Sequence, residues 1–265
     1  MRRTTLAALC LATAATVGLT ACQSGQTDGS RKSDGKPGGS ATSSPLSKEK
    51  EAFAGLTGAE IMDRATKATT GASSLRMTGD VPDDESGGTI TIDMALDKKG
   101  DCAGTMSFSG QGEAELIKTG DTVYMKYDEK FLRAQSKGEP AADVDAAVSL
   151  LAGKWTKMSA KGEDAQDIAG FCDLDTVLGD AEDTASDARR GETATVDGTP
   201  AIVLHEQDGK DRLKVYVATE GEPYVLRVDS ESAKDPGSLT LSDFGKPVPA
   251  HKPSGDVLDL DALGG

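Results

Sequence analysis

The chain of 265 residues carries 44 acidic side chains against 29 basic ones, which gives a formal net charge of −15 at pH 7. This excess of negative charge argues against a nucleic-acid-binding protein and against electrostatic docking on anionic lipid headgroups, because both require clustered positive charge. Any contact with a membrane must therefore depend on something other than a basic surface.

The N-terminal segment has the layout of a bacterial lipoprotein signal peptide. Two arginines at positions 2 and 3 precede an apolar run over residues 6–19, which is shorter than the roughly 20 residues of a membrane-spanning helix. Small residues then lead to Cys22, the position at which such a leader is cleaved and the new N-terminal thiol is acylated. We expect residues 1–21 to be removed and Cys22 to carry the lipid, palmitate included. The alternative is an ordinary cleaved leader followed by an incidental cysteine.

Acylation at Cys22 determines where the protein works. Two buried acyl chains give stable anchoring, since each methylene contributes about 0.8 kcal/mol and one chain alone is marginal. Cleavage after residue 21 removes two basic residues and no acidic ones, which leaves 27 against 44 and a net charge of −17. The mature protein is expected on the extracytoplasmic face of the cell membrane, held there by its lipid anchor.

A flexible segment separates the anchor from the folded part. Gly, Ser and Pro account for 14 of the 25 residues in 23–47, with no hydrophobic periodicity. Such a chain cannot bury a core and has a root-mean-square reach of roughly 25–30 Å. We therefore expect the lipidated cysteine and linker over 22–47, followed by one folded domain over 48–265.

The folded part contains two cysteines. Cys10 leaves with the leader and Cys22 is acylated, so Cys102 and Cys172 remain. A pair of thiols in an oxidising compartment is most simply one disulfide, which contributes on the order of 4 kcal/mol in the chain-entropy model. A redox-active pair is the less favoured alternative, because the spacing is not that of a Cys-x-x-Cys motif.

The folded part begins with a helix and continues with strands. Thr57-Gly58-Ala59-Glu60 forms a capping box, and an apolar side follows before Gly71 ends the helix. Strict alternation over 89–96 predicts a strand. Further runs separated by Gly and Asp turns predict an antiparallel meander with strands at 73–81, 101–109, 112–118, 122–127 and 131–135.

Helices are expected in the middle of the chain and strands near its end. Apolar residues at helical spacing predict helices over 141–151 and 164–178. Strands are then expected at 192–196, 201–206, 212–218, 224–230 and 238–244. The fold class is therefore α+β: one large antiparallel sheet that curls, with a helical insert in its concavity.

Three segments resemble a known family. They are residues 74–79, the strand pair at 215–218 and 223–228, and above all the ending Leu-Thr-Leu-Ser-Asp-Phe-Gly-Lys-Pro-Val at 239–248. Over about residues 55–260 the chain resembles the LolA-like superfamily, and within it the actinobacterial LppX and LprG type of lipoprotein. The resemblance implies a curved half-barrel of antiparallel strands wrapped around helices, with an apolar cavity that accepts the acyl chains of a lipid or glycolipid. It transfers no individual site residue to this chain.

The apolar faces of the strands are the candidate cavity lining. Filling of a closed core is the alternative role for the same side chains, and it is the better expectation for a sheet protein without the family resemblance. With the resemblance, an apolar concavity with few polar groups fits the ligand sites of such folds. The candidate lining residues are Ile90, Ile92, Met94, Leu96, Ile202, Leu204, Val215 and Val217.

The sequence offers little catalytic chemistry. His205 and His251 are far apart and have no metal-ligand spacing, and the chain lacks a nucleophile elbow, a P-loop and a dinucleotide motif. Trp155, the one tryptophan, is expected to fill the core rather than to form a ligand platform. We therefore expect no catalytic residue, no metal site, no cofactor and no enzymatic activity.

Three hypotheses from different classes remain. The leading one is a lipoprotein that binds, and in some settings transfers, an acyl-chain lipid. The second is an envelope sensor or protein-interaction module that uses the same fold through its surface, with an envelope protein as partner. The third, a hydrolase, has little support because a base and a nucleophile are both lacking.

Overall fold

The computed structural model describes residues 52–83, 87–162, 165–179, 187–208, 211–232 and 236–262. Residues 48–265 form one compact unit. The leader, Cys22 and the linker lie outside the described residues, so the expectations for residues 1–47 stay predictions.

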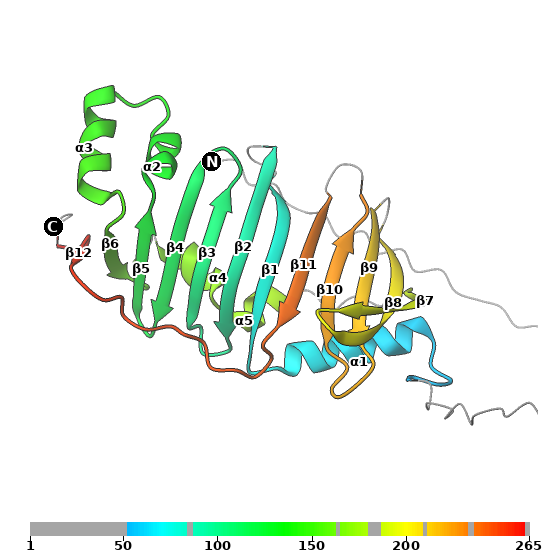
Figure 1. Cartoon of the computed structure of the whole chain (residues 1–265). Coiled ribbons are helices and arrows are strands. Elements are labelled where there is room, and N and C mark those ends of the chain that lie inside the picture. Colours follow the sequence, from blue (N-terminus) through cyan, green and yellow to red (C-terminus); the bar gives the residue numbers. More distant parts are fainter. Residues whose placement is uncertain are drawn as a thin grey trace, which may run out of the picture. The chain divides into compact units, whose positions relative to one another are not determined.

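The described part is dominated by a single sheet of twelve strands, in the spatial order β12-β6-β5-β4-β3-β2-β1-β11-β10-β9-β8-β7 (Figure 1). The strands are β1 (Ser74–Asp83), β2 (Gly88–Asp97), β3 (Cys102–Phe108), β4 (Gly112–Thr119), β5 (Thr122–Tyr127), β6 (Trp155–Ser159), β7 (Arg189–Val196), β8 (Thr199–Asp208), β9 (Asp211–Ala218), β10 (Val225–Ser230), β11 (Gly237–Ser242) and β12 (Val257–Asp259).

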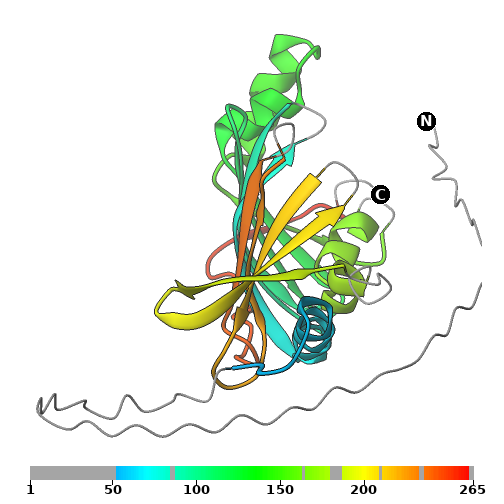
Figure 2. The same ribbon diagram turned by 90° about the vertical axis from the view of Figure 1, so that its right-hand side faces the viewer.

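Two meanders meet at the centre of this sheet. Strands β1 to β5 lead away from the centre to one side, and β7 to β11 return to it from the far edge. The two halves join where β11 pairs with β1, for example Leu241 opposite Met77. All neighbouring strands are antiparallel except β12, which runs parallel to β6. The expected α+β class with one large curved antiparallel sheet is confirmed (Figure 2).

Five helices accompany the sheet in the described residues: α1 (Gly58–Gly71), α2 (Glu129–Gln135), α3 (Ala141–Leu151), α4 (Gln166–Phe171) and α5 (Leu174–Leu178). Helices α1, α4 and α5 lie on the concave, inner face, whereas α2 and α3 form a helical pair beside the end of β5 (Figures 1 and 2). None of the helices in the described ranges is long and apolar enough to cross a membrane.

Helix α1 follows the capping pattern of its sequence. The Thr57 side chain accepts a hydrogen bond from the Glu60 backbone N–H at 3.2 Å, and the Glu60 carboxylate accepts one from the Thr57 N–H at 2.8 Å. The same contact lowers the pKa of Glu60, because the backbone N–H of Thr57 stabilises the charged form. The helix then buries Ile61 and Ala65 against the sheet. The predicted start and end of α1 are confirmed.

Alternation along the strands builds the core on the inner face. In β2, Met94 and Leu96 are fully buried, while Ile90 and Ile92 on the same face are half-buried. Met94 faces Met77 of β1 and belongs with it to the main cluster of buried apolar residues. The hydrophobic face of the sheet and the helices on it therefore form one core.

Two of the predicted elements differ in the structure. Residues 131–135, expected as a strand, belong to α2, because the Asp128 side chain accepts a hydrogen bond from the Phe131 N–H at 2.6 Å and caps a helix. The ion pair between Glu129 and Arg133 at 2.8 Å adds a helical i,i+4 contact. The single helix expected over 164–178 is two short helices, α4 and α5, with Asp173 capping the second; residue 164 lies outside the described residues.

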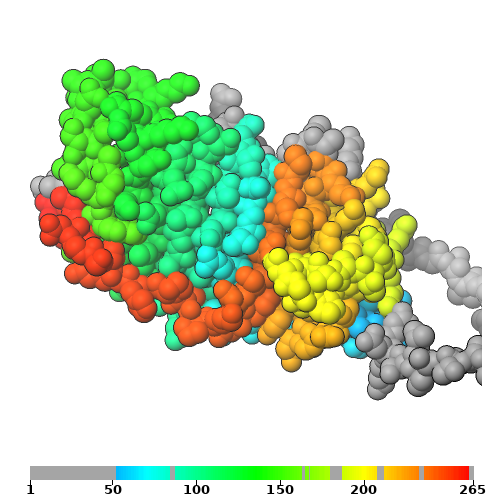
Figure 3. All heavy atoms as spheres, viewed as in Figure 1, coloured from blue at the N-terminus to red at the C-terminus, as the bar shows by residue number. Residues whose placement is uncertain are grey.

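The last part of the chain, residues 243–262, is here called the C-terminal strap. It leaves β11, crosses the outer face along the lower ends of the strands and ends beside β6 (Figures 1 and 3). Its start is fixed by the Ser74 hydroxyl, which donates to the Lys246 carbonyl at 2.7 Å. Its end is fixed by the Lys157–Asp259 ion pair at 2.7 Å. The sequence did not predict β6 or β12.

Candidate functional site

The inner face holds an apolar hollow of about 660 Å³, here called the α1 pocket. Helix α1 and the end of α5 form one side of it, and the inner faces of β1, β8, β9, β10 and β11 form the other. Its lining residues are Met62, Asp63, Thr66, Lys67, Thr69, Thr70, Met77, Val177, Leu178, Glu206, Leu213, Val215, Val225, Val228, Leu239 and Leu241.

The floor of the α1 pocket and its rim differ in chemistry. Ten of the sixteen lining residues are apolar, and those on the strands are Leu, Val or Met apart from Glu206. The polar residues come mainly from α1, where Asp63 and Lys67 are exposed and Thr66 is half-exposed. The pocket thus presents an aliphatic floor with charged and hydroxyl groups at its edge.

Specific contacts hold α1 over this floor. The Thr69 hydroxyl accepts a hydrogen bond from the backbone N–H of Val225 in β10 at 2.9 Å. The chain that leads into α1 is fixed by the Arg190 guanidinium of β7, which donates to the carbonyls of Phe53 at 2.7 Å and Leu56 at 3.0 Å. These bonds set the distance between the helix and the strands that it covers.

The second wall is fixed by the predicted disulfide. Cys102, at the start of β3, is joined to Cys172, the residue that follows α4, and both are fully buried. Leu174 at the start of α5 is also fully buried, and Val177 and Leu178 at its end line the pocket. The expectation of a Cys102–Cys172 disulfide is confirmed.

The candidate lining residues from the sequence are distributed between core and pocket. Val215 is the member of that set that lines the α1 pocket. Ile92 is half-buried against the core, and Ile90 is half-buried near the start of β2. The remaining candidates are buried in the main core cluster: Met94, Leu96, Ile202, Leu204 and Val217. A role of these residues in ligand binding stays a prediction.

Sequence reasoning missed most of the residues that form the pocket. Leu239 and Leu241 alternate in β11, and Val225 and Val228 stand on the neighbouring strand. Alternation around 239–241 was available as a pattern, but it could not show which strands face α1. That information depends on the β11–β1 pairing, which joins segments more than 150 residues apart.

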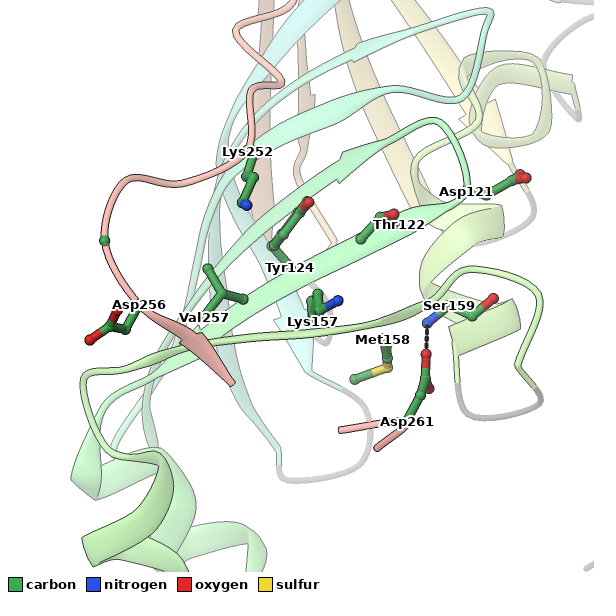
Figure 4. A pocket seen from close by; sticks show the side chains of 11 residues that line it. Asp121, Thr122, Tyr124, Lys157, Met158, Ser159, Lys252, Asp256, Val257 and Asp261 are labelled. Atoms are coloured by element: carbon green, nitrogen blue, oxygen red, sulfur yellow. Dashed lines mark hydrogen bonds between the residues drawn. The ribbon is translucent and has the colours of Figure 1, made fainter. Parts of the chain in front are cut away.

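A second hollow, of about 500 Å³, lies on the outer face between β5, β6 and the C-terminal strap (Figure 4). We call it the strap pocket. Its walls are largely polar and include Asp121, Tyr124, Lys157, Lys252 and Asp261.

Most charges of the strap pocket already have partners. Lys157 pairs with Asp259, which lowers the pKa of that carboxyl through a hydrogen bond and the lysine charge. Asp121 pairs with Lys161 at 2.6 Å, and the Asp261 carboxylate accepts a hydrogen bond from the Ser159 N–H at 2.9 Å (Figure 4). The Lys157–Asp259 and Ser159–Asp261 contacts thus hold the strap on the sheet, whereas the Asp121–Lys161 pair lies beside β5 and β6.

The histidines and the tryptophan do not form a reactive site in the described residues. His205, on β8, lies 3.4 Å from the Glu192 carboxylate, and His251 is exposed in the strap. The described residues contain no group of three side chains that could hold a metal ion. Trp155 is half-buried in β6 with the Lys126 ammonium 5.8 Å from its ring centre, so the expectation of a core position was wrong.

Solved structures were found that resemble this chain. The crystal structure of LprF from Mycobacterium bovis matches with a TM-score of 0.51 at 15% identity, over 75% of this chain and 97% of LprF. Lipoprotein LppX from Mycobacterium tuberculosis matches with a TM-score of 0.47 at 13% identity, over 73% and 97% of the two chains. A LolA superfamily protein from Nitrosomonas europaea matches with a TM-score of 0.28 at 10% identity, over 74% and 98%.

No family model matches the sequence, and no curated protein matches it. At 15% identity the likeness to LprF concerns the fold, and nearly the whole of that structure is covered. The twelve-stranded curved sheet with helices on its inner face is the architecture that the sequence resemblance implied. The chain therefore shares the fold of LprF.

Proposed function

We propose that this protein is a non-enzymatic lipoprotein of the extracytoplasmic membrane face that binds an acyl-chain lipid in the α1 pocket. The observation that carries the proposal is the aliphatic floor formed by Leu213, Val215, Val228, Leu239 and Leu241. A volume of about 660 Å³ lies within the range of about 300–1,000 Å³ of small-molecule sites, which are mostly apolar with a few polar groups.

The floor and rim suit different parts of a lipid. Each methylene moved from water onto the aliphatic floor contributes about 0.8 kcal/mol, so a long chain binds without specific polar contacts. The head of the lipid or glycolipid would meet Asp63, Thr66 and Lys67 at the α1 edge. Recognition of the head is therefore expected to be weaker than recognition of the chain.

Paired tryptophan substitutions in β11 test the proposal. Leu239 lines the pocket, whereas its neighbour Thr240 points to the opposite face of the strand. Leu239→Trp should fill the space that an acyl chain needs, while Thr240→Trp should leave it open. We would measure displacement of a fluorescent fatty acid from the delipidated protein, together with thermal unfolding.

The two variants separate binding from stability. Binding to the probe should fall at least about tenfold, or about 1.4 kcal/mol, for Leu239→Trp and remain unchanged for Thr240→Trp. Equal binding by both variants, at comparable stability, would refute the α1 pocket as the acyl site.

The alternative function is an envelope sensor or protein-interaction module. Helix α3 supports it, because it buries no residue and exposes 46% of Leu150. If the wild-type protein binds neither extracted lipid nor the probe, a Leu150→Asp variant that loses an envelope partner would favour this alternative.

A further inference from the structure

The Cys102–Cys172 disulfide lies on the inner face, next to α5, and the end of α5 lines the α1 pocket. We infer that the disulfide is a positioning element for ligand binding, because it holds α5 at the height above the sheet that the pocket requires. This inference rests on the proposed function and adds to it the determinant of pocket width.

The first step is the short path from disulfide to pocket. Cys172 follows α4 directly, and α5 begins two residues later at Leu174. Val177 and Leu178, the pocket-lining residues of this segment, lie only about one helical turn after Leu174. A shift of Cys172 therefore moves the wall almost as a rigid unit.

The second step is that the disulfide is the one covalent attachment of this wall in the described residues. Lys98 pairs with Asp175 at 2.9 Å. The Asp175 side chain is 64% exposed, and exposed ion pairs contribute little to stability. Asp173 forms a single bridge with Asp97 at the end of β2. Leu174 is the one fully buried side chain of α5. Val177 and Leu178 are partly buried and pack against the same core, so apolar contacts and one covalent bond together hold this wall.

The third step concerns the opposite wall. Helix α1 is held independently through Thr69 and through the Arg190 contacts to Phe53 and Leu56. Helix α1 also contacts α5, but its bonds to β10 and β7 do not pass through α5. Loss of the disulfide therefore leaves α1 and the aliphatic floor in place and frees the α5 side alone.

A global role is the competing explanation of the same bond. A disulfide that closes a long loop stabilises the whole fold by restricting the unfolded chain. In that case its removal lowers stability, and ligand binding falls only in proportion to the unfolded fraction. The two explanations differ in the region that loses protection from hydrogen exchange when the bond is removed: α5 in the first, the whole fold in the second.

The experiment compares the double variant Cys102→Ser/Cys172→Ser with Leu116→Ala, both in the full mature chain. Leu116 is fully buried in β4 and does not line the α1 pocket, so its truncation destabilises the core while the pocket lining and the disulfide are kept. Hydrogen exchange of residues 174–178 is followed in the ligand-free proteins, and dissociation of a fluorescent fatty acid is followed in parallel at a temperature where both variants are folded.

We expect faster exchange at 174–178 in the cysteine variant, with the strands β8 to β11 protected, and dissociation of the probe about tenfold faster than from Leu116→Ala. Unchanged exchange at 174–178, or equal dissociation from the two variants, would overturn the inference. The exchange result does not need a ligand. If the wild type fails to bind the probe, the proposed function fails, and the exchange data still show whether the disulfide holds α5.

Discussion

Thr69 shows how one side chain can determine the position of a pocket wall. It is buried in α1, and its hydroxyl is the acceptor for the backbone N–H of Val225 on β10. A buried N–H without a partner costs about 1–3 kcal/mol. Thr69 therefore joins α1 to β10 and helps to set the width of the pocket between them.

We predict that Thr69→Val lowers the free energy of unfolding by about 1–3 kcal/mol, because the shape is kept while the acceptor is lost. Chemical denaturation measures the change. Thr66→Val on the same helix is the control, since Thr66 is half-exposed at the pocket rim, and it should stay within about 0.5 kcal/mol of wild type. Equal stability of the two variants would show that the Val225 contact contributes nothing.

At the level of elements, local sequence patterns predicted those helices and strands that are determined by residues close together in the chain. The capping box of Thr57 and Glu60 marked α1, and the strict alternation over 89–96 marked β2. The prediction of a strand over 131–135 is wrong because the apolar Phe131 and Leu132 suit either period, whereas the Asp128 side chain caps a helix there.

Long-range pairing could not be predicted from local patterns. Strand β12 has only three residues and exists through its pairing with β6, about 100 residues earlier. The same holds for the site: the disulfide followed from cysteine counting, whereas the pocket depends on α1 crossing β9 to β11. Of the eight candidate residues, Val215 lines that pocket because its strand passes under α1.

The C-terminal strap should respond to acid. The Lys157 ammonium lowers the pKa of Asp259 in the folded state, chiefly through their hydrogen bond. A lowered folded pKa means that the stabilisation is present above the ordinary aspartate value of about 3.9 and is lost as the pH falls through the folded value. We predict partial release of β12 as the pH falls below about 4.

Trp155 reports on this release, because it pairs with Val257 of β12 and is the one tryptophan of the chain. Its fluorescence should change between pH 6 and pH 3, and Asp259→Asn should show the released spectrum already at neutral pH. Asp256→Asn, at the other end of the strap pocket, serves as the control. A spectrum that stays constant down to pH 3 would contradict the role of the ion pair.

At the scale of the whole molecule, membrane anchoring and ligand binding are proposed to depend on different parts of the chain. The full chain carries a net charge of −15, and the expected loss of residues 1–21 would make it −17. Such a chain has little electrostatic attraction to an anionic membrane. In the proposed function, the acyl chains expected on Cys22 bind the bilayer and the α1 pocket binds a lipid.

We predict that Cys22→Ala moves the protein from the membrane fraction to the aqueous fraction on detergent-phase partitioning. Lowering the salt concentration should not restore membrane association, because the acidic surface offers no substitute for the anchor. Continued partitioning of the variant with membranes would show that another anchor exists.

The central claim is that the α1 pocket holds an acyl chain, and native mass spectrometry with lipid extraction tests it most directly. The protein is best isolated as the exported Cys22→Ala chain, so that the covalent lipid does not obscure a bound one. We predict a bound mass that is released by organic extraction from this protein and is absent when Leu239→Trp is added. A protein without bound lipid that also takes up none from supplied lipids, or full occupancy in the Leu239→Trp variant, would contradict the account.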